Sequence, residues 1–179
     1  MAEVELERGD ALIVVDVLND FVHEDGDALL ASFRERGAAM RETIEHARAA
    51  GIPVIYVNDD RDAWDGDVRR LVDDAVAGAG GDVIRHLVPQ AGDRILVKHR
   101  YSAFDRTALD LLLSSLEVDR VVLVGAATEG CIVQTAIAAR EQGLKATIVA
   151  SACATTDAEL EETSLRYARE VGGVRVNRG

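Results

Sequence analysis

Short apolar runs with strand character alternate with longer helix-like stretches along the whole chain. This alternation predicts a parallel sheet, because each helix returns the chain across one face of the sheet before the next strand begins. We therefore expect an α/β fold with three layers, in which helices cover both faces of a six-stranded sheet. The expected strands lie near residues 11–16, 53–58, 94–98, 120–125, 145–150 and 173–177, and the expected helices near 28–50, 67–78, 106–116, 130–142 and 157–171.

The length and the local signals fit a single domain that spans residues 1–179. A chain of 179 residues can bury a substantial core, and no linker-like, repetitive or low-complexity stretch divides it. Gly51 and Pro53 stand where the first helix should end, and Asp157 stands where the last helix should be capped.

Charge and cysteine content exclude several classes of function. With 20 basic and 32 acidic residues, the formal charge is −12, so the surface should repel phosphate backbones and anionic lipids. We expect no nucleic-acid and no membrane partner, since no apolar run approaches the roughly 20 residues that span a bilayer. No signal-peptide pattern opens the chain, and two cysteines make no disulfide framework. These features predict a cytoplasmic protein with reduced thiols.

Three expected strands are followed by, or end in, side chains that can carry chemistry. Asp16 closes the apolar run at residues 11–16, Lys98 closes the run at 94–98, and Cys131 follows the run at 120–125 after a short glycine-containing turn. In open parallel sheets the ligand crevice lies at the carboxyl ends of the strands. An acid, an amine and a thiol should therefore meet at one edge of the sheet.

Cys131 is expected at the start of a helix, where unpaired N–H groups and the positive end of the helix dipole favour a thiolate. The thiolate is the nucleophilic form, so this position predicts a reactive cysteine with a lowered pKa. The alternative is that Cys131 is a small buried hydrophobe, as most intracellular cysteines are. Cys153 follows an apolar strand and is interpreted as a packed core thiol.

Three motifs resemble those of the isochorismatase-like cysteine hydrolases, a superfamily that includes nicotinamidases, N-carbamoylsarcosine amidase and ureidoacrylate amidase. They are VVDVLNDF around Asp16, KHRYSAF from Lys98, and GAATEGC before and including Cys131. The similarity extends from about residue 12 to residue 151, and the motifs have the order and spacing of the family. The sequence departs from the common family pattern at Leu18, His99 and Glu129, where Gln, Pro and Asp or Asn are more usual.

The resemblance implies a strand order of 3-2-1-4-5-6 and a cysteine-dependent hydrolase. Such an enzyme would cleave a C–N bond of a small amide, carbamoyl or ureido substrate through a thioester. Cys131 would be the nucleophile, Asp16 the proton carrier, and Lys98 the charge that stabilises both. The backbone N–H groups of Ala127 and Cys131 would form the oxyanion hole, with a cis peptide between Ala126 and Ala127. The resemblance also implies a homodimer or homotetramer and no cofactor.

Two aromatic side chains, Phe21 and Trp64, are candidates for the wall of the substrate pocket, because they fall beside the proposed catalytic segments. The acidic run from Asn58 to Asp67 suggests a metal site, since nicotinamidases bind a divalent ion near this position through an Asp and two His. The run contains no histidine, so we predict a solvated loop and no metal.

Several other functions are compatible with parts of the sequence. An inactive binding or scaffold protein could keep the fold, although replacement of Asp16, Lys98 or Cys131 would then be expected. An isochorismatase-type ether hydrolase is a second alternative, but true isochorismatases carry no cysteine at the nucleophile position. A thiol redox sensor would need Cys153 nearby as a resolving cysteine. GAATEG lacks the middle glycine of a dinucleotide-binding fingerprint, which disfavours a nucleotide-binding protein.

Overall fold

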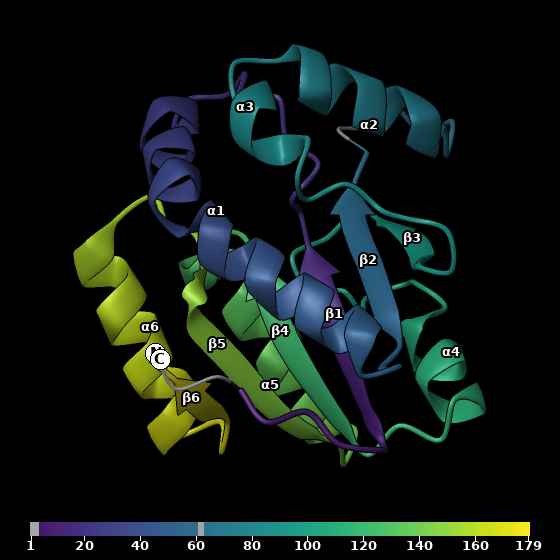
Figure 1. The fold of residues 1–179 in the computed structure, drawn as a ribbon. Coiled ribbons are helices and arrows are strands. Elements are labelled where there is room, and N and C mark those ends of the chain that lie inside the picture. The colour runs from purple at the N-terminus through teal and green to yellow at the C-terminus, as the bar shows by residue number, and fades with distance from the viewer. Residues whose placement is uncertain (1–3, 61–62) are drawn as a thin grey trace.

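One parallel sheet of six strands forms the centre of the molecule (Figure 1). The structure is a computed structural model that describes residues 4–60 and 63–179. Its strand order is β3-β2-β1-β4-β5-β6, which confirms the fold class and the order that the family resemblance implied. The strands are β1 (Asp10–Val15), β2 (Val54–Asp59), β3 (Arg94–Lys98), β4 (Arg120–Gly125), β5 (Lys145–Cys153) and β6 (Arg175–Asn177).

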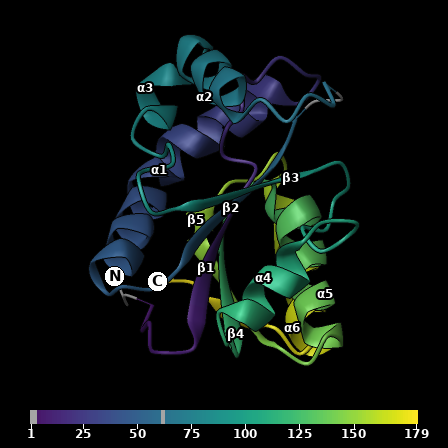
Figure 2. The ribbon, with the colours of Figure 1, turned by 90° about the vertical axis from the view of Figure 1, so that its right-hand side faces the viewer.

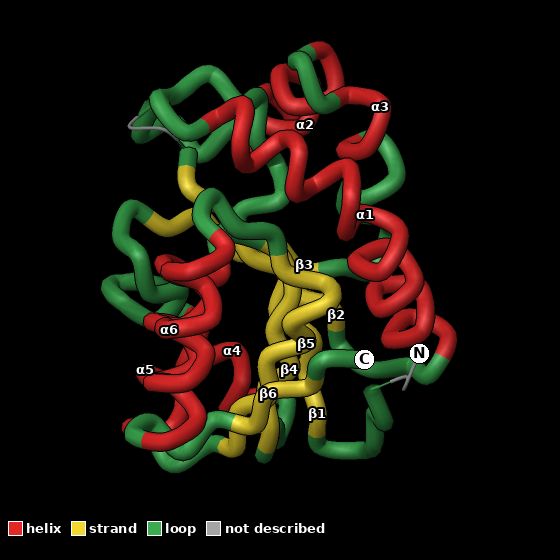
Figure 3. The backbone as a smooth tube through the Cα atoms, turned by 90° about the vertical axis from the view of Figure 1, so that its left-hand side faces the viewer, coloured by secondary structure: helices red, strands yellow, loops and turns green. Residues whose placement is uncertain are grey.

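Helices cover both faces of the sheet, as the alternating sequence pattern predicts. α1, α2 and α3 lie on one side, and α4, α5 and α6 lie on the other (Figures 2 and 3). No helix in the described part of the chain combines the length and the apolarity needed to span a bilayer. The helices are α1 (Gly26–Ala49), α2 (Val68–Ala77), α3 (Gly81–Ile84), α4 (Leu109–Ser115), a π-helical turn η1 (Thr128–Ile132), α5 (Val133–Glu141) and α6 (Ala158–Glu170).

The strand β1 shows why the sheet strands read as continuous apolar runs. All six of its residues are buried, because helices cover the sheet on both sides. Leu12 and Val14 belong to the core beneath α1, whereas Ala11, Ile13 and Val15 belong to the core beneath α4, α5 and α6. The sheet therefore separates two hydrophobic cores. The helices of both layers pack against it and fix the carboxyl ends of its strands.

The predicted boundaries agree with the structure at several points. Gly51 follows α1 with a φ of 70°, a conformation that glycine adopts readily, and the chain then enters β2. The Asp157 carboxylate accepts hydrogen bonds from the N–H groups of Glu159 and Leu160, so it caps α6 as expected.

Three elements differ from the sequence-based expectation. α4 begins at Leu109 rather than at residue 106, because Arg106 has a φ of 57° and cannot belong to a right-handed helix. The short helix α3 was not predicted, since four residues give no periodic signal. β5 continues to Cys153 rather than to residue 150, because its pairing with β4 shifts register beside Gly125 and then resumes.

The direction of the connections reverses between β1 and β4, so a crevice opens there at the carboxyl ends of the strands. Gly125, the last residue of β4, lies directly beside Val15 of β1. A Cβ atom on Gly125 would lie 2.0 Å from the carbonyl oxygen of Val15, and the glycine has a φ of 121°. Only glycine fits at this point, and it allows the chain to leave β4 tightly against β1.

Candidate active site

Asp16 is the first residue after β1, and two neighbours fix its carboxylate. Oδ1 accepts a hydrogen bond of 2.7 Å from the backbone N–H of Asp59, the last residue of β2. Oδ2 lies 2.7 Å from Nζ of Lys98. Burial raises the pKa of Asp16, while the Lys98 charge and the Asp59 N–H act in the opposite direction. A carboxyl group with a raised pKa is suited to accept a proton and return it.

Lys98 ends β3, and its ammonium group lies at the centre of the site. Its side chain is only 1% exposed. Nζ contacts Asp16 and donates hydrogen bonds to the carbonyl oxygen of Arg100 at 2.9 Å and to Sγ of Cys131 at 3.4 Å. These three acceptors match the three donors of an ammonium group. Burial lowers the pKa of Lys98, but Asp16 and Cys131 more than offset this effect, so the pKa is raised and the lysine is charged.

The lysine reaches Asp16 from a strand that is not adjacent to β1. The strand β2 lies between β1 and β3. Val15 pairs with Val57 across β1 and β2, whereas Lys98 pairs with Asp59 across β2 and β3. β3 therefore ends two residues beyond the level of Val57, and the long lysine side chain crosses the end of β2 to the site.

Cys131 lies in a single π-helical turn, Thr128–Ile132, which we call the cysteine turn and which precedes α5. The peptide bond between Ala126 and Ala127 is cis. The carbonyl oxygen of Ala127 accepts hydrogen bonds from the N–H groups of Gly130 and Ile132, at 3.1 and 3.2 Å. The cysteine thus stands at the start of a helical segment, as the sequence predicts, although the first turn is wider than an α-helical one.

The pKa of the Cys131 thiol is raised, whereas the sequence analysis predicted a lowered pKa. Burial and the Asp16 carboxylate raise its pKa to about 12, and Lys98 only partly opposes them. The loss of water around the sulfur outweighs the effect of the Lys98 charge. At neutral pH the sulfur of Cys131 is therefore a protonated thiol, and it lies beside the paired side chains of Asp16 and Lys98.

The structure places the two predicted pocket residues differently. Phe21 is 7% exposed and packs edge-to-face against Phe33 of α1, with ring centroids 5.3 Å apart. Trp64 is 70% exposed and stacks on His99, the residue after Lys98, with centroids 3.7 Å apart and planes 13° apart. Trp64 therefore lies against the residue that follows β3, whereas Phe21 packs in the core. Their role in a substrate pocket stays a prediction.

One supporting side chain, Asn58, was missed by the sequence analysis. Asn58 is buried, accepts a hydrogen bond from the N–H of Leu18 at 2.9 Å and donates one to its carbonyl oxygen at 3.2 Å, which fixes the segment after Asp16. The ring of Tyr101 lies over Gly130, since a Cβ atom there would be 3.6 Å from the ring. The signal for Asn58 was its place at the end of an apolar run, which the acidic residues that follow it obscured.

The acidic run from Asn58 to Asp67 does not form a cation site in the described part of the chain. Among residues 4–60 and 63–179, no group of three or more His, Cys, Asp or Glu side chains is placed to hold a metal ion. Asp60 instead faces His99, with 3.1 Å between Oδ1 and Nδ1, and accepts a hydrogen bond from the N–H of Trp64. Arg61 and Asp62 of this run lie outside the described residues.

A family model described as the isochorismatase domain matches residues 10–177. This match covers nearly the whole chain, and it includes all three motifs. The chain belongs to the isochorismatase family. Among curated proteins it is similar to the uncharacterized isochorismatase family protein YaaI of Bacillus subtilis, with 30% identity over 161 residues, which cover 90% of this chain and 89% of that protein.

Two of the similar proteins are named as enzymes that act on C–N bonds. The ureidoacrylate amidohydrolase RutB of Azorhizobium caulinodans is 31% identical over 155 residues, which cover 70% of this chain and 67% of that protein. The crystal structure of N-carbamoylsarcosine amidase from Thermoplasma acidophilum superposes with a TM-score of 0.72 at 32% identity, and covers 94% of this chain and 95% of that one. These relatives support an amidohydrolase that cleaves C–N bonds.

Proposed function

We propose that this member of the isochorismatase family is a cysteine-dependent amidohydrolase that cleaves a small amide, carbamoyl or ureido substrate through a thioester on Cys131. One observation carries the proposal. The buried ammonium of Lys98 contacts both Asp16 Oδ2, at 2.7 Å, and Cys131 Sγ, at 3.4 Å. A nucleophile, a proton carrier and a fixed positive charge are therefore in mutual contact at the crevice between β1 and β4.

The geometry suggests the order of the proton transfers. Asp16 accepts the thiol proton while Sγ of Cys131 bonds to the carbonyl carbon of the substrate, so the site never has to hold a free thiolate at rest. Lys98 stabilises both the sulfur and the carboxylate as their charges change. When the C–N bond breaks, Asp16 returns the proton to the leaving nitrogen, and a thioester remains. Water then attacks the thioester with Asp16 as the base, which restores the thiol.

The negatively charged oxygen of the tetrahedral intermediate needs hydrogen-bond donors to stabilise it. We assign this role to the backbone N–H groups of Ala127, which directly precedes the cysteine turn, and of Cys131, which lies within it. One such donor contributes roughly 3–4 kcal/mol to comparable acyl-transfer reactions. The chemistry then requires no metal ion, because the nucleophile, the base and the oxyanion donors all come from the chain.

The relatives narrow the substrate class. Ureidoacrylate and N-carbamoylsarcosine, named in two of them, both carry a carbamoyl group on nitrogen. We propose that the substrate of this chain has the same group or a simple amide, held between the exposed ring of Trp64 and the site, with Phe21 supporting the far wall. A homodimer or homotetramer stays a prediction, which light scattering at micromolar concentration will check.

The test is ammonia release from a panel that contains ureidoacrylate, N-carbamoylsarcosine, nicotinamide and simple aliphatic amides. At least one should be hydrolysed, and mass spectrometry of quenched enzyme should find the acyl group on Cys131. The matched control is Cys153→Ser, which should keep turnover, whereas Cys131→Ser should abolish it. Turnover that survives Cys131→Ser, or an acyl group on another residue, would overturn the proposal.

A further inference from the structure

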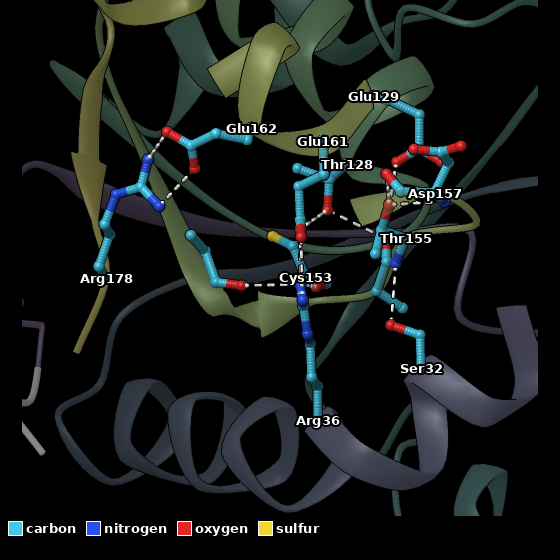
Figure 4. A network of polar contacts seen from close by, with 12 residues as sticks. Ser32, Arg36, Thr128, Glu129, Cys153, Thr155, Asp157, Glu161, Glu162 and Arg178 are labelled. Carbon is cyan, nitrogen blue, oxygen red and sulfur yellow. Dashed lines mark hydrogen bonds and ion pairs between the residues drawn. The ribbon is translucent and has the colours of Figure 1, made fainter. Parts of the chain in front are cut away.

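The carboxylate of Glu129 ties the cysteine turn to the loop between β5 and α6 (Figure 4). It accepts three hydrogen bonds there: 2.8 Å from Oγ1 of Thr155, and 2.8 and 2.6 Å from the backbone N–H and Oγ1 of Thr156. Glu129 is two residues before Cys131. A single side chain therefore connects the backbone that carries the nucleophile to a separate loop, through three donors.

The loop that receives Glu129 is itself fixed. The N–H of Thr155 donates a hydrogen bond of 3.0 Å to Oγ of Ser32, a buried residue of α1. The next residue but one, Asp157, caps α6. The loop is thus attached to helices on both faces of the sheet, so it can act as a rigid anchor for the cysteine turn.

Thr128 provides a second connection on the same side of the turn. Its N–H donates a hydrogen bond of 2.9 Å to the carbonyl oxygen of Ala154. Its Oγ1 lies 2.9 Å from Oε1 of Glu161, a carboxylate that Arg36 binds through both of its terminal nitrogens at 2.5 and 2.9 Å. Figure 4 shows both connections, one through each of two consecutive residues of the turn.

The contacts of Glu129 are with the anchoring loop, and Glu129 is not among the main groups that shift the pKa of the Cys131 thiol. The groups that shift the pKa of the Cys131 thiol, besides burial, are Asp16 and Lys98. The hydrogen-bond partners of Glu129 are neutral hydroxyl and backbone groups of the anchoring loop. These three hydrogen bonds are placed to hold the backbone from Ala127 to Cys131, whose N–H groups are the proposed oxyanion donors.

We propose that Glu129 is a positioning residue that aims the oxyanion donors of the cysteine turn, through its three hydrogen bonds to the loop of Thr155 and Thr156. This inference rests on the proposed function, because it assigns a purpose to the backbone donors. It predicts that loss of Glu129 impairs acyl transfer to Cys131 more than it impairs the nucleophilicity of the sulfur.

Two probes of Cys131 separate these effects. With p-nitrophenyl acetate, the thiol proton passes to Asp16, an S–C bond forms at the acetyl carbon, and the C–O bond breaks to release p-nitrophenolate through an oxyanion intermediate. With iodoacetamide, an S–C bond forms at the methylene carbon and iodide leaves, so no oxyanion develops. The ratio of the acylation rate to the alkylation rate therefore reports on the oxyanion donors alone.

We expect Glu129→Ala to lower the acylation rate by roughly 10- to 100-fold, as a misplacement of up to about 1 Å does in enzymes, and to change alkylation of Cys131 by less than about threefold. Glu129→Gln keeps the side-chain volume and one accepting oxygen, so the acylation rate should fall less in this variant. Thr156→Val removes the 2.6 Å partner and should lower the same ratio. Glu159→Gln, which changes an exposed carboxylate on α6, is the matched control and should leave the ratio unchanged.

The outcomes are distinct. If the wild-type protein releases p-nitrophenolate without forming an acetyl adduct on Cys131, the proposed function fails. If the wild type forms the adduct, and Glu129→Gln and Thr156→Val remain folded with an unchanged ratio, Glu129 is only structural and this inference fails. An equal fall in both rates would also overturn it, because the sulfur rather than the oxyanion donors would then be misplaced.

Discussion

The two cysteines of this chain each lie close to a buried ion pair, yet their surroundings differ in one decisive respect. Cys131 is partly exposed, and its sulfur accepts a hydrogen bond from Lys98 of the Lys98–Asp16 pair. Cys153 is fully buried, and its sulfur faces the carbonyl oxygen of Leu123 at 3.7 Å.

The ion pair of Arg36 and Glu161 contacts the backbone of Cys153 rather than its thiol. Arg36 contacts Glu161 through both terminal nitrogens and donates a hydrogen bond of 2.5 Å to the carbonyl oxygen of Cys153. Burial raises the pKa of both thiols. Burial alone therefore gives an inert thiol, and what distinguishes Cys131 is a proton acceptor and a positive charge in direct contact with sulfur at an open edge of the sheet.

The strongest test removes the proton acceptor. Asp16→Asn keeps the shape of the side chain but cannot carry the proton, so acylation by p-nitrophenyl acetate should fall by about 10²- to 10⁴-fold. The pKa of the Cys131 thiol should fall at the same time, because the Asp16 carboxylate raises it in the wild type. Stopped-flow acylation and the pH dependence of alkylation measure the two effects. Near-normal acylation in this variant would place the proton carrier elsewhere.

The second test compares the two thiols in the wild-type protein. The pKa of the Cys131 thiol is about 12, and each pH unit below the pKa changes the thiolate fraction tenfold. Cys131 should therefore react with iodoacetamide roughly 10²-fold faster at pH 10 than at pH 8. Cys153 should react only through unfolded chains, whose thiols titrate near pH 8.5, so its rate should rise only about fourfold over this range.

Urea provides the control for this comparison. Sub-denaturing urea should accelerate the labelling of Cys153 and leave that of Cys131 nearly unchanged, as peptide mapping by mass spectrometry will show. A plateau in the alkylation of Cys131 at neutral pH would contradict the raised pKa and would indicate a resting thiolate paired with Lys98.

The third test breaks the ion pair near Cys153. Glu161→Gln leaves Arg36 without its carboxylate partner in a largely buried place, so the free energy of unfolding should fall by about 3 kcal/mol, at the low end for a broken buried pair. Urea denaturation followed by circular dichroism measures this loss. The variant Glu162→Gln, whose carboxylate pairs with Arg178 at the surface, is the control and should cost less than about 1 kcal/mol. Equal losses would mean that burial does not make the Arg36–Glu161 pair more important for stability than the surface pair.

The smallest effect should come from the positive charge at the active site. Lys98→Met removes a positive charge that lowers the pKa of the Cys131 thiol, so that pKa should rise further. Alkylation of Cys131 at pH 9 should then slow by about tenfold for each unit of the rise. The alkylation rate of Cys153 in the same sample is the internal reference. An unchanged pH profile at Cys131 would show that the lysine has only a structural role.

The parts of the fold that the sequence predicted are those that local patterns determine. Buried parallel strands are continuous apolar runs, so five of the six strands begin within about one residue of their expected positions. The residues Asp16, Lys98 and Cys131 were identified because a polar residue at the end of an apolar run is exposed to the crevice by the geometry of the sheet. The strand order itself came from the family resemblance.

The features that were missed depend on contacts between distant segments. The raised pKa of Cys131 results from the amount of water that the assembled site excludes, which no local pattern encodes. The partners of Glu129 lie 26 and 27 positions away along the chain, so its substitution for the more usual Asp or Asn carried no interpretable signal. The acidic residues after Asn58 obscured its place at the end of an apolar run, and the sequence could not show its partner Leu18, which is 40 positions away.

The close approach of Gly125 to Val15 has a consequence for the recognition of distant homologues. A relative that lacked the proposed catalytic cysteine could retain this architecture, because the sheet pairing does not involve the thiol of Cys131. A relative that replaced the glycine could not, because a single methyl group would have to separate the two halves of the sheet. A sequence profile for remote homologues should therefore weight the position of Gly125 more strongly than that of Cys131. The residue at the position of Cys131 should instead distinguish active enzymes from inactive homologues.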